Sequence, residues 1–422
     1  MRDNPSSAMT YICDDNHSYI IRMIVNLKKE ISYEALRWAV DTAVKRYPYF
    51  ALKIEHMPDD TELVFVPNDR EIPIFDHIGV VMLASEQTNY HIQAVSYSGN
   101  TICFDICHGF ADGSSLTEWA KTVLYYYIEK KYNTTLNKKN IKTLDDEITD
   151  EEYLDPIKPY VDMILNKPME EMAPIPSKKP ARIKDYYTIT PDSKNVRFWV
   201  NSKDFMRVAK SNDGTPTSFV IALLAKLLNK KKKSVELSIV VDVAKDLRSG
   251  LGVKESHHPT VIPFSITYPR RALDYDVEML STMARGRFIL MQDEDGLKTL
   301  VNNFATSCAL SLMLPDIKSK CQFNTSCISG LNENNTFAIS YTGQKNFGSV
   351  EEYIDTIYLQ VTNDASDLMI ELFSVGDKLC FSFMQTFKEN DLVLDLISYL
   401  EKNGVAVHGF ESDKLIYPKV KI

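Results

Sequence analysis

The sequence predicts a two-lobed α/β protein. The chain has 422 residues, and because single domains cluster near about 100–200 residues, two lobes are expected. Strand-like segments alternate with segments of helical periodicity in both halves, which predicts sheets flanked by helices. A stretch rich in charge and proline separates the halves and predicts a connection. We expect an N-terminal lobe over residues 1–165, a linker over 166–190 and a C-terminal lobe over 191–422.

The first half begins with a predicted strand over Tyr19–Leu27, a run of β-branched and apolar residues. A helix over Tyr33–Tyr47 follows, because its apolar residues recur every three or four positions. Ser32 is a suitable N-cap for this helix, and Pro48 ends it. Four further strands are predicted, at Phe50–Glu55, Glu62–Val66, Tyr90–Ser98 and Thr101–Cys107.

The second half repeats the mixture of strands and helices. Helices are predicted near Ser202–Lys210, Thr217–Asn229, Val277–Met291 and Asn390–Asn403. Strands are predicted at Val196–Val200, Val235–Val243, Val261–Thr267, Phe337–Tyr341, Ile354–Leu359, Leu368–Phe373 and Lys378–Phe383.

Composition limits the classes of function. The formal net charge of −9 argues against non-specific binding to nucleic acid or to an anionic membrane. Seven cysteines form no CxxC pair, and no signal peptide is evident, so we expect a cytoplasmic protein. No metal-binding, Walker-type or dinucleotide-binding motif is present, so no metal site is predicted.

The strongest functional signal is the hexapeptide His108-Gly109-Phe110-Ala111-Asp112-Gly113. His108 has the parity of the apolar residues in the preceding strand, so its imidazole is expected to point inward. Imidazole titrates near neutral pH and can take a proton from a hydroxyl or amine. A capping box at Ser115 and Glu118 predicts that a helix to about Lys131 opens just after the hexapeptide. Taken alone, His108 could also be a core histidine with only a packing role.

The pattern H-x-x-x-D-G between a strand and a helix resembles the active-site motif of the coenzyme A-dependent acyltransferase superfamily. This superfamily includes alcohol acetyltransferases and the condensation domains of nonribosomal peptide synthetases. Arg46-Tyr47-Pro48-Tyr49-Phe50 is similar to the R-x-P-x-L/F segment of the family. The stretch from Val241 to Arg248 resembles its V-D-x-R segment, and Ser340-Tyr341-Thr342-Gly343 resembles its S-N-x-G element.

The resemblance implies two chloramphenicol acetyltransferase-like lobes, each a mixed sheet flanked by helices, arranged as a V-shaped pseudo-dimer. His108 would be the general base that helps an alcohol or amine attack an acyl thioester. Asp112 would hold the motif turn through Arg248, and the amide of Gly113 would stabilise developing negative charge. Ser340 and Thr342 would line the cleft. The thioester, acyl-coenzyme A or a phosphopantetheine conjugate, would be a co-substrate, with no tightly bound cofactor.

Two departures from the family pattern leave alternatives open. Cys107 stands where many condensation domains have a second histidine, and it is expected to be a buried packing residue. The D-F-G-W-G element of the plant BAHD enzymes is absent, which disfavours that group. The first alternative is a freestanding condensation enzyme that works with an acyl or peptidyl carrier protein. The second is a non-catalytic, condensation-like binding module.

Overall fold

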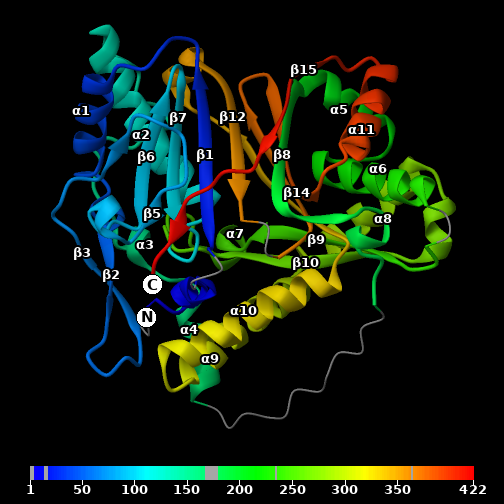
Figure 1. Cartoon of the computed structure of the whole chain (residues 1–422), viewed down its shortest axis with the longest axis horizontal. Coiled ribbons are helices and arrows are strands. Elements are labelled where there is room, and N and C mark those ends of the chain that lie inside the picture. The colour runs from blue at the N-terminus through cyan, green and yellow to red at the C-terminus, as the bar shows by residue number, and fades with distance from the viewer. Residues whose placement is uncertain (1–3, 14–17, 167–178, 233–234, 363–364) are drawn as a thin grey trace.

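Two mixed β-sheets lie side by side, and helices flank each of them (Figure 1). The structure is a computed structural model that describes residues 4–13, 18–166, 179–232, 235–362 and 365–422. The predicted two-lobed α/β fold is confirmed. No helix in these ranges is both long enough and apolar enough to cross a membrane.

The first sheet has the strand order β12-β1-β7-β6-β4. Its strands are β1 (Ile20–Leu27), β4 (Ile74–Phe75), β6 (Gln93–Ser98), β7 (Thr101–Cys107) and β12 (Ile354–Val361). Helices α1 (Tyr33–Ala43) and α2 (Gly113–Tyr132) pack together on its outer side (Figure 1). Around this sheet lie β2 (Leu52–His56), β3 (Leu63–Pro67), β5 (Met82–Leu83), α3 (Asp150–Tyr153) and α4 (Lys158–Leu165).

The second sheet has the strand order β10-β9-β11-β13-β14-β8-β15. Its strands are β8 (Ile189–Asn201), β9 (Ile239–Asp246), β10 (Val261–Tyr268), β11 (Phe337–Lys345), β13 (Leu368–Val375), β14 (Lys378–Phe387) and β15 (Val407–Lys414). Strands β9, β11 and β13 are parallel neighbours. The helices on this side are α5 (Ser202–Ser211), α6 (Pro216–Lys231), α8 (Val277–Leu290) and α11 (Asp391–Lys402).

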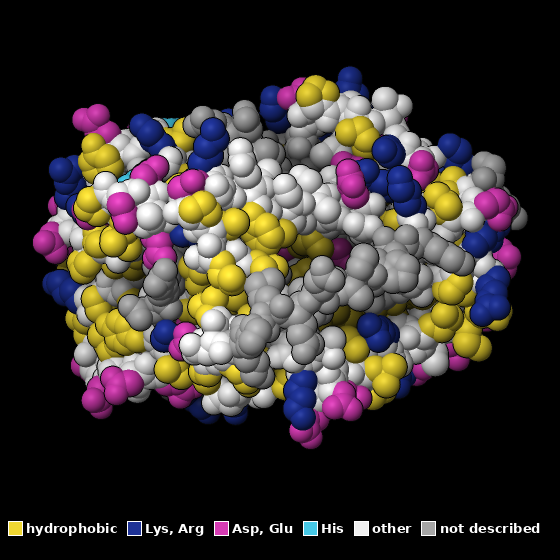
Figure 2. All heavy atoms as spheres, turned by 90° about the horizontal axis from the view of Figure 1, so that it is seen from below, with side chains coloured by type: hydrophobic (Ala, Val, Ile, Leu, Met, Phe, Trp, Pro, Cys, Tyr) yellow, Lys and Arg dark blue, Asp and Glu magenta, His cyan; other side chains and the backbone are white. Residues whose placement is uncertain are grey.

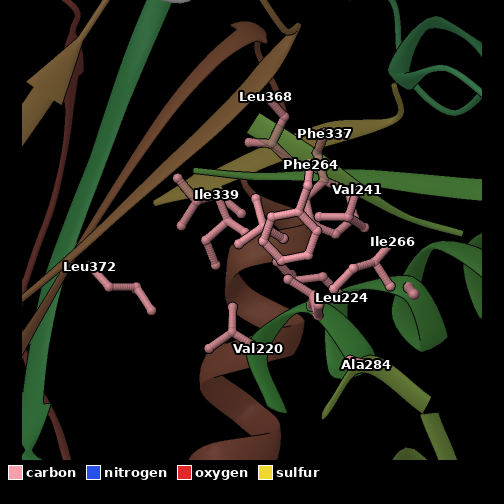
Figure 3. Close-up of a cluster of buried hydrophobic side chains, with 14 of the residues drawn as sticks. Val220, Leu224, Val241, Phe264, Ile266, Ala284, Phe337, Ile339, Leu368 and Leu372 are labelled. Atoms are coloured by element: carbon pink, nitrogen blue, oxygen red, sulfur yellow. The ribbon is translucent and has the colours of Figure 1, made fainter. Parts of the chain in front are cut away.

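A core of buried hydrophobic side chains joins the second sheet to its helices (Figure 3). Val220 and Leu224 of α6 point toward Ile339 of β11 and its neighbours in this core. Helix α6 begins where the Thr215 hydroxyl accepts a hydrogen bond from the Ser218 amide, a standard N-cap. A separate core holds the first sheet against α1 and α2. Each sheet thus has its own hydrophobic support, as two lobes require.

Below the two sheets lie two long helices that the sequence pattern did not predict, α9 (Glu294–Met313) and α10 (Ile317–Asn334) (Figure 1). Signals for both were present. Asp293 and Asp316 are N-caps, each accepting a hydrogen bond from an amide three residues later. The buried residues of α9 also recur at helical spacing: Leu300, Val301, Phe304, Ala305, Cys308 and Leu312.

The sheets do not divide the chain at one point. Strand β12 comes from the second predicted lobe but pairs with β1 and completes the first sheet. The C-terminal β16 (Lys419–Val420) also returns to the first half, where it pairs with β5. Of the predicted linker over 166–190, residues 167–178 lie outside the described residues.

The face of the molecule that is at the bottom of Figure 1 carries hydrophobic side chains toward its centre (Figure 2). Charged side chains of both signs lie around the rim of the same face.

Candidate active site

His108 follows the last residue of β7, a central strand of the first sheet. Its backbone amide donates to the Tyr19 carbonyl at 2.8 Å, and the Tyr19 ring stacks on the imidazole with centroids 4.5 Å apart. Nδ1 lies 3.1 Å from the Ala111 carbonyl oxygen. A carbonyl can only accept, so Nδ1 carries the proton and Nε2 of the neutral ring is free to accept another. Ring and backbone contacts therefore present a basic nitrogen in a fixed orientation.

Burial lowers the pKa of His108 below its ordinary value of 6.5. The imidazole is therefore neutral at pH 7, and it is lost as a base only when the pH falls through this lowered pKa. With a neutral alcohol as acceptor, we expect kcat/KM for acyl-coenzyme A to be flat near neutral pH and to decline only below pH 6.5. A pH profile of kcat/KM checks this expectation. An acid limb whose midpoint lies above 6.5 would contradict it.

Asp112 is the N-cap of α2, and its carboxylate is the centre of a network that joins the two lobes. Oδ1 accepts from the amides of Ser114 and Ser115 at 3.1 and 3.2 Å. Oδ2 accepts from Arg248 Nη1 at 2.7 Å and from the Thr260 amide at 3.3 Å. Although burial opposes ionisation, the Arg248 guanidinium holds the pKa of Asp112 below its usual range. The capping box predicted at Ser115 is wrong, because the helix begins two residues earlier, at Gly113.

All three nitrogen atoms of the Arg248 guanidinium donate hydrogen bonds in this network. Its Nη1 also lies 3.0 Å from Asp246 Oδ2, and Nη2 donates to the Ser115 hydroxyl at 3.1 Å. Nε and Nη2 further donate to the carbonyls of Ser256 and His258. The structure thus brings together Asp112 and Arg248, which are 136 residues apart in the sequence.

Gly109 allows the motif turn to pack closely against the N-terminal segment of the chain. A Cβ at this position would clash with the Thr10 backbone nitrogen, in the 3-10 helix Pro5–Ile12. We expect Gly109→Ala to lower the free energy of unfolding by about 1–3 kcal/mol, because the packed segment must move. Gly330→Ala is the matched control, since nothing lies near its Cβ. Thermal unfolding of both variants checks the prediction, and equal stability would contradict it.

The cavity that His108 lines, here called the inner cavity, has a volume of about 230 Å³. Its walls come from both sheets and from α10. Gly113 also lines it, and a Cβ there would come within 3.1 Å of Thr342 Cγ2. Ser340 and Thr342 both line this cavity, as expected from their motif. The Thr342 hydroxyl, however, points toward the Leu372 carbonyl at 3.5 Å.

A second and larger hollow, here called the outer cleft, has a volume of about 730 Å³. Ser114, Asp246 and Lys345 line both the inner cavity and the outer cleft, so the two spaces meet at these residues. Cationic side chains outnumber the acidic ones, Glu118, Asp146, Asp246 and Glu255, in the lining of the outer cleft. Its lysines are Lys121, Lys138, Lys139, Lys142, Lys254 and Lys345.

Three residues of the site were not predicted from the sequence: Tyr19, Lys345 and Glu371. Burial lowers the pKa of Lys345, whose Nζ lies 3.4 Å from the Ser114 hydroxyl. Burial raises the pKa of Glu371 to about 8. Each lies on a strand or at a strand end, and only the pairing of distant strands brings them to one cavity. If β11 and β13 are known to be neighbours, the alternation of side chains along each strand predicts that Ser340 and Glu371 face the same side of the sheet.

Two other motif residues have structural contacts. Cys107 is buried and its thiol is hydrogen-bonded to that of Cys13. Arg46 makes a buried ion pair with Glu152 at 2.7 Å, and the Tyr49 hydroxyl donates to the same carboxylate. In the described ranges, no group of three or more His, Cys, Asp or Glu side chains is arranged to hold a metal.

Several solved structures share this two-lobed fold over nearly the whole chain. The structure is similar to F. graminearum TRI101 complexed with coenzyme A and T-2 mycotoxin, with a TM-score of 0.60 and 10% identity over 96% of this chain and 99% of that one. It is also similar to polyketide synthase associated protein 5 from Mycobacterium tuberculosis, with a TM-score of 0.58 and 13% identity over 93% and 96% of the two chains.

A third similar structure is the starter condensation domain of rhizomide synthetase RzmA, with a TM-score of 0.52 and 13% identity over 94% of each chain. No protein-family model and no curated protein matches the sequence. The likeness therefore concerns the fold over nearly the whole chain, and the chemistry has to be argued from the site.

Proposed function

We propose that this protein transfers an acyl group from acyl-coenzyme A to an alcohol or amine, with His108 as general base. The observation that carries this proposal is the meeting of two spaces beside the motif. The inner cavity contains His108, whose Nε2 is an acceptor, and it joins the lysine-rich outer cleft at Ser114, Asp246 and Lys345. The inner cavity suits the acyl acceptor, and the outer cleft suits a negatively charged acyl donor.

The proposed reaction is a direct displacement. Nε2 of His108 takes the proton of the acceptor O–H or N–H while that oxygen or nitrogen bonds to the thioester carbonyl carbon. The tetrahedral intermediate then expels the coenzyme A thiolate as the C–S bond breaks, and the proton passes from His108 to sulfur. No oxidant, metal or covalent acyl-enzyme is needed. The Gly113 amide and the Lys345 ammonium are the groups we assign to the developing oxyanion.

The charge of the outer cleft favours coenzyme A over a carrier-bound thioester. Coenzyme A carries a diphosphate and a further phosphate, whereas the arm of a carrier protein carries one phosphodiester. Lys139 and Lys254 are exposed lysines among those lining the cleft. Several lysines at an entrance match the donor with several phosphates. TRI101, complexed with coenzyme A, has the same fold and supports this assignment.

Turnover with acyl-coenzyme A tests the proposal. Purified protein is incubated with acetyl-coenzyme A and a panel of alcohols and amines, and the free thiol is measured. The same acyl groups on a phosphopantetheinylated carrier protein form the second arm. Transfer from the carrier alone would support the condensation alternative, and binding without turnover of either donor would support a non-catalytic module.

Charge reversal at the cleft tests the donor path. We expect the double variant Lys139→Glu/Lys254→Glu to raise KM for acyl-coenzyme A about tenfold, because a loss of about 0.7 kcal/mol at each exposed, solvent-screened site adds up to about 1.4 kcal/mol. KM for the acceptor is expected to stay constant. Lys203→Glu/Lys210→Glu on the exposed side of α5 is the matched control. An equal rise of KM in both double variants would contradict this path.

A further inference from the structure

The inner cavity has one acidic wall. Asp242 of β9 pairs in register with Ala338 of β11, and Ser340 of β11 pairs with Glu371 of β13. All four side chains line the cavity, since residues in register share a face of the sheet. The two carboxyl groups are almost completely buried, with Asp242 6% and Glu371 4% exposed.

Neither carboxyl group makes an ion pair with a lysine or arginine in the described part of the chain. Asp242 accepts from the Ser265 hydroxyl at 2.7 Å and from Asn335 Nδ2 at 3.0 Å. Glu371 interacts with the hydroxyl of Ser340. Asp112 and Asp246, which also line the cavity, are both compensated by Arg248. The two groups on the sheet wall thus stand apart from the motif network.

A buried carboxyl group without a cation is costly to ionise. Burial accordingly raises the pKa of Glu371 to about 8 and also raises the pKa of Asp242. At neutral pH most Glu371 side chains hold a proton while the cavity is empty. A ligand ammonium would supply the missing charge and let Glu371 ionise.

The rest of the cavity suits an alkyl chain. Hydrophobic side chains from both sheets make up much of its wall, among them Ile21, Leu359, Val361, Val261, Pro263 and Met369. Glu371 lies close enough to Tyr19 to influence that phenol electrostatically, and Tyr19 stacks on His108. The acidic group and the base therefore line the same cavity.

We propose that the acceptor is an alkyl amine with two functional groups, a diamine or an amino alcohol. Glu371 binds its ammonium group, and the hydroxyl or second amine reaches His108. This inference rests on the proposed acyl transfer but adds the class of acceptor and the residue that selects it. Glu371 touches the acceptor away from the reacting atoms, so it determines specificity and takes no part in proton transfer.

Calorimetric binding without any acyl donor tests this proposal separately from turnover. The probes are 1,4-diaminobutane, 4-aminobutan-1-ol and the neutral 1,4-butanediol. One charge-assisted hydrogen bond predicts that the two amines bind about 10- to 100-fold more tightly than the diol. Glu371→Gln keeps the shape of the side chain and is expected to remove this difference. Asp155→Asn replaces a buried carboxyl group that does not line the cavity, and it is expected to have no effect.

Proton release on amine binding gives a second readout. At pH 7 amine binding should release a proton from Glu371, seen as a dependence of the binding enthalpy on the buffer, and this release should shrink at pH 9. The other titratable groups on the cavity wall are Tyr19, His108, Asp112, Asp242, Asp246, Tyr341 and Lys345. Loss of proton release in Glu371→Gln assigns it to Glu371.

The outcomes separate the two proposals. Equal binding of diol and amines, or unchanged amine binding in Glu371→Gln, would overturn the role of Glu371. Amine binding that depends on Glu371 but yields no transfer from any thioester would leave that role intact and overturn the proposed function.

Discussion

Replacing His108 by alanine is expected to lower kcat for acyl transfer about 10²–10⁴-fold, the usual contribution of a general base. Nε2 of this residue is the ring nitrogen that can accept a proton, since Nδ1 donates to the Ala111 carbonyl. Without the ring, no base takes the proton from the O–H or N–H group of the substrate that receives the acyl group. KM for acyl-coenzyme A is expected to stay nearly constant, because the lysines of the outer cleft are untouched. Steady-state kinetics with acetyl-coenzyme A measures both constants.

A control for this variant must separate chemistry from folding. His91 is fully buried, and its Nε2 lies 2.8 Å from the Arg70 carbonyl oxygen. His91 does not line either space beside the motif. His91→Ala should therefore lose stability but retain kcat, whereas His108→Ala should retain an intact fold by circular dichroism and lose kcat. Full activity in His108→Ala would exclude it as the base.

The elements beside the motif were the easiest to predict from the sequence. Strand β7 spans Thr101–Cys107 as predicted, because a clean apolar alternation ends at a turn with two glycines. Helix α10 was missed because its sequence is rich in Ser, Asn and Lys and only four of its residues are buried. A helix with such a narrow buried face has weak periodicity. Tertiary packing on the 3-10 helix Pro5–Ile12 and on α9 supports it instead.

The candidate site was predictable only where a local motif carried it. His108, Asp112 and Gly113 lie within six consecutive residues, so the sequence shows them together. Glu371 and Lys345 belong to strands that meet the motif only through the packing of two sheets. The cavity wall is acidic because β9, β11 and β13 are parallel neighbours, which brings Asp242 and Glu371 to the same face. Such pairings join segments far apart in the chain, so a short window of sequence does not show them.

Replacing Arg248 by methionine is expected to lower the free energy of unfolding by about 3–5 kcal/mol, the typical effect of leaving a buried charge without its partner. Asp112 is 0% and Arg248 4% exposed, and they meet at 2.7 Å. Methionine retains much of the side-chain volume, so loss of charge and hydrogen bonds dominates. Urea unfolding at pH 7 measures the effect. Asp112→Asn/Arg248→Met should recover part of the loss, because no uncompensated carboxylate remains.

The pH dependence of this loss distinguishes an electrostatic tether from simple packing. In the native protein the pKa of Asp112 is held below its usual value of 3.8, so the stability it contributes is present above that pH and is lost as the pH falls through the lowered pKa. In Arg248→Met, burial without a cation raises the same pKa, and the folded state then binds the extra proton. The deficit should therefore be largest at neutral pH and shrink as the pH approaches about 4.

Arg197→Met is the matched control for this series. Its guanidinium pairs with Glu411 and Asp413, whose side chains are 56% and 61% exposed. An ion pair with such exposed partners is worth about 0–1 kcal/mol, so this variant should change stability little and without the same pH trend. A similar loss in both variants, or a loss in Arg248→Met that is independent of pH, would show that Arg248 acts through packing. In that case the ion pair between Asp112 and Arg248 would not be the interaction that joins the motif turn to the second lobe.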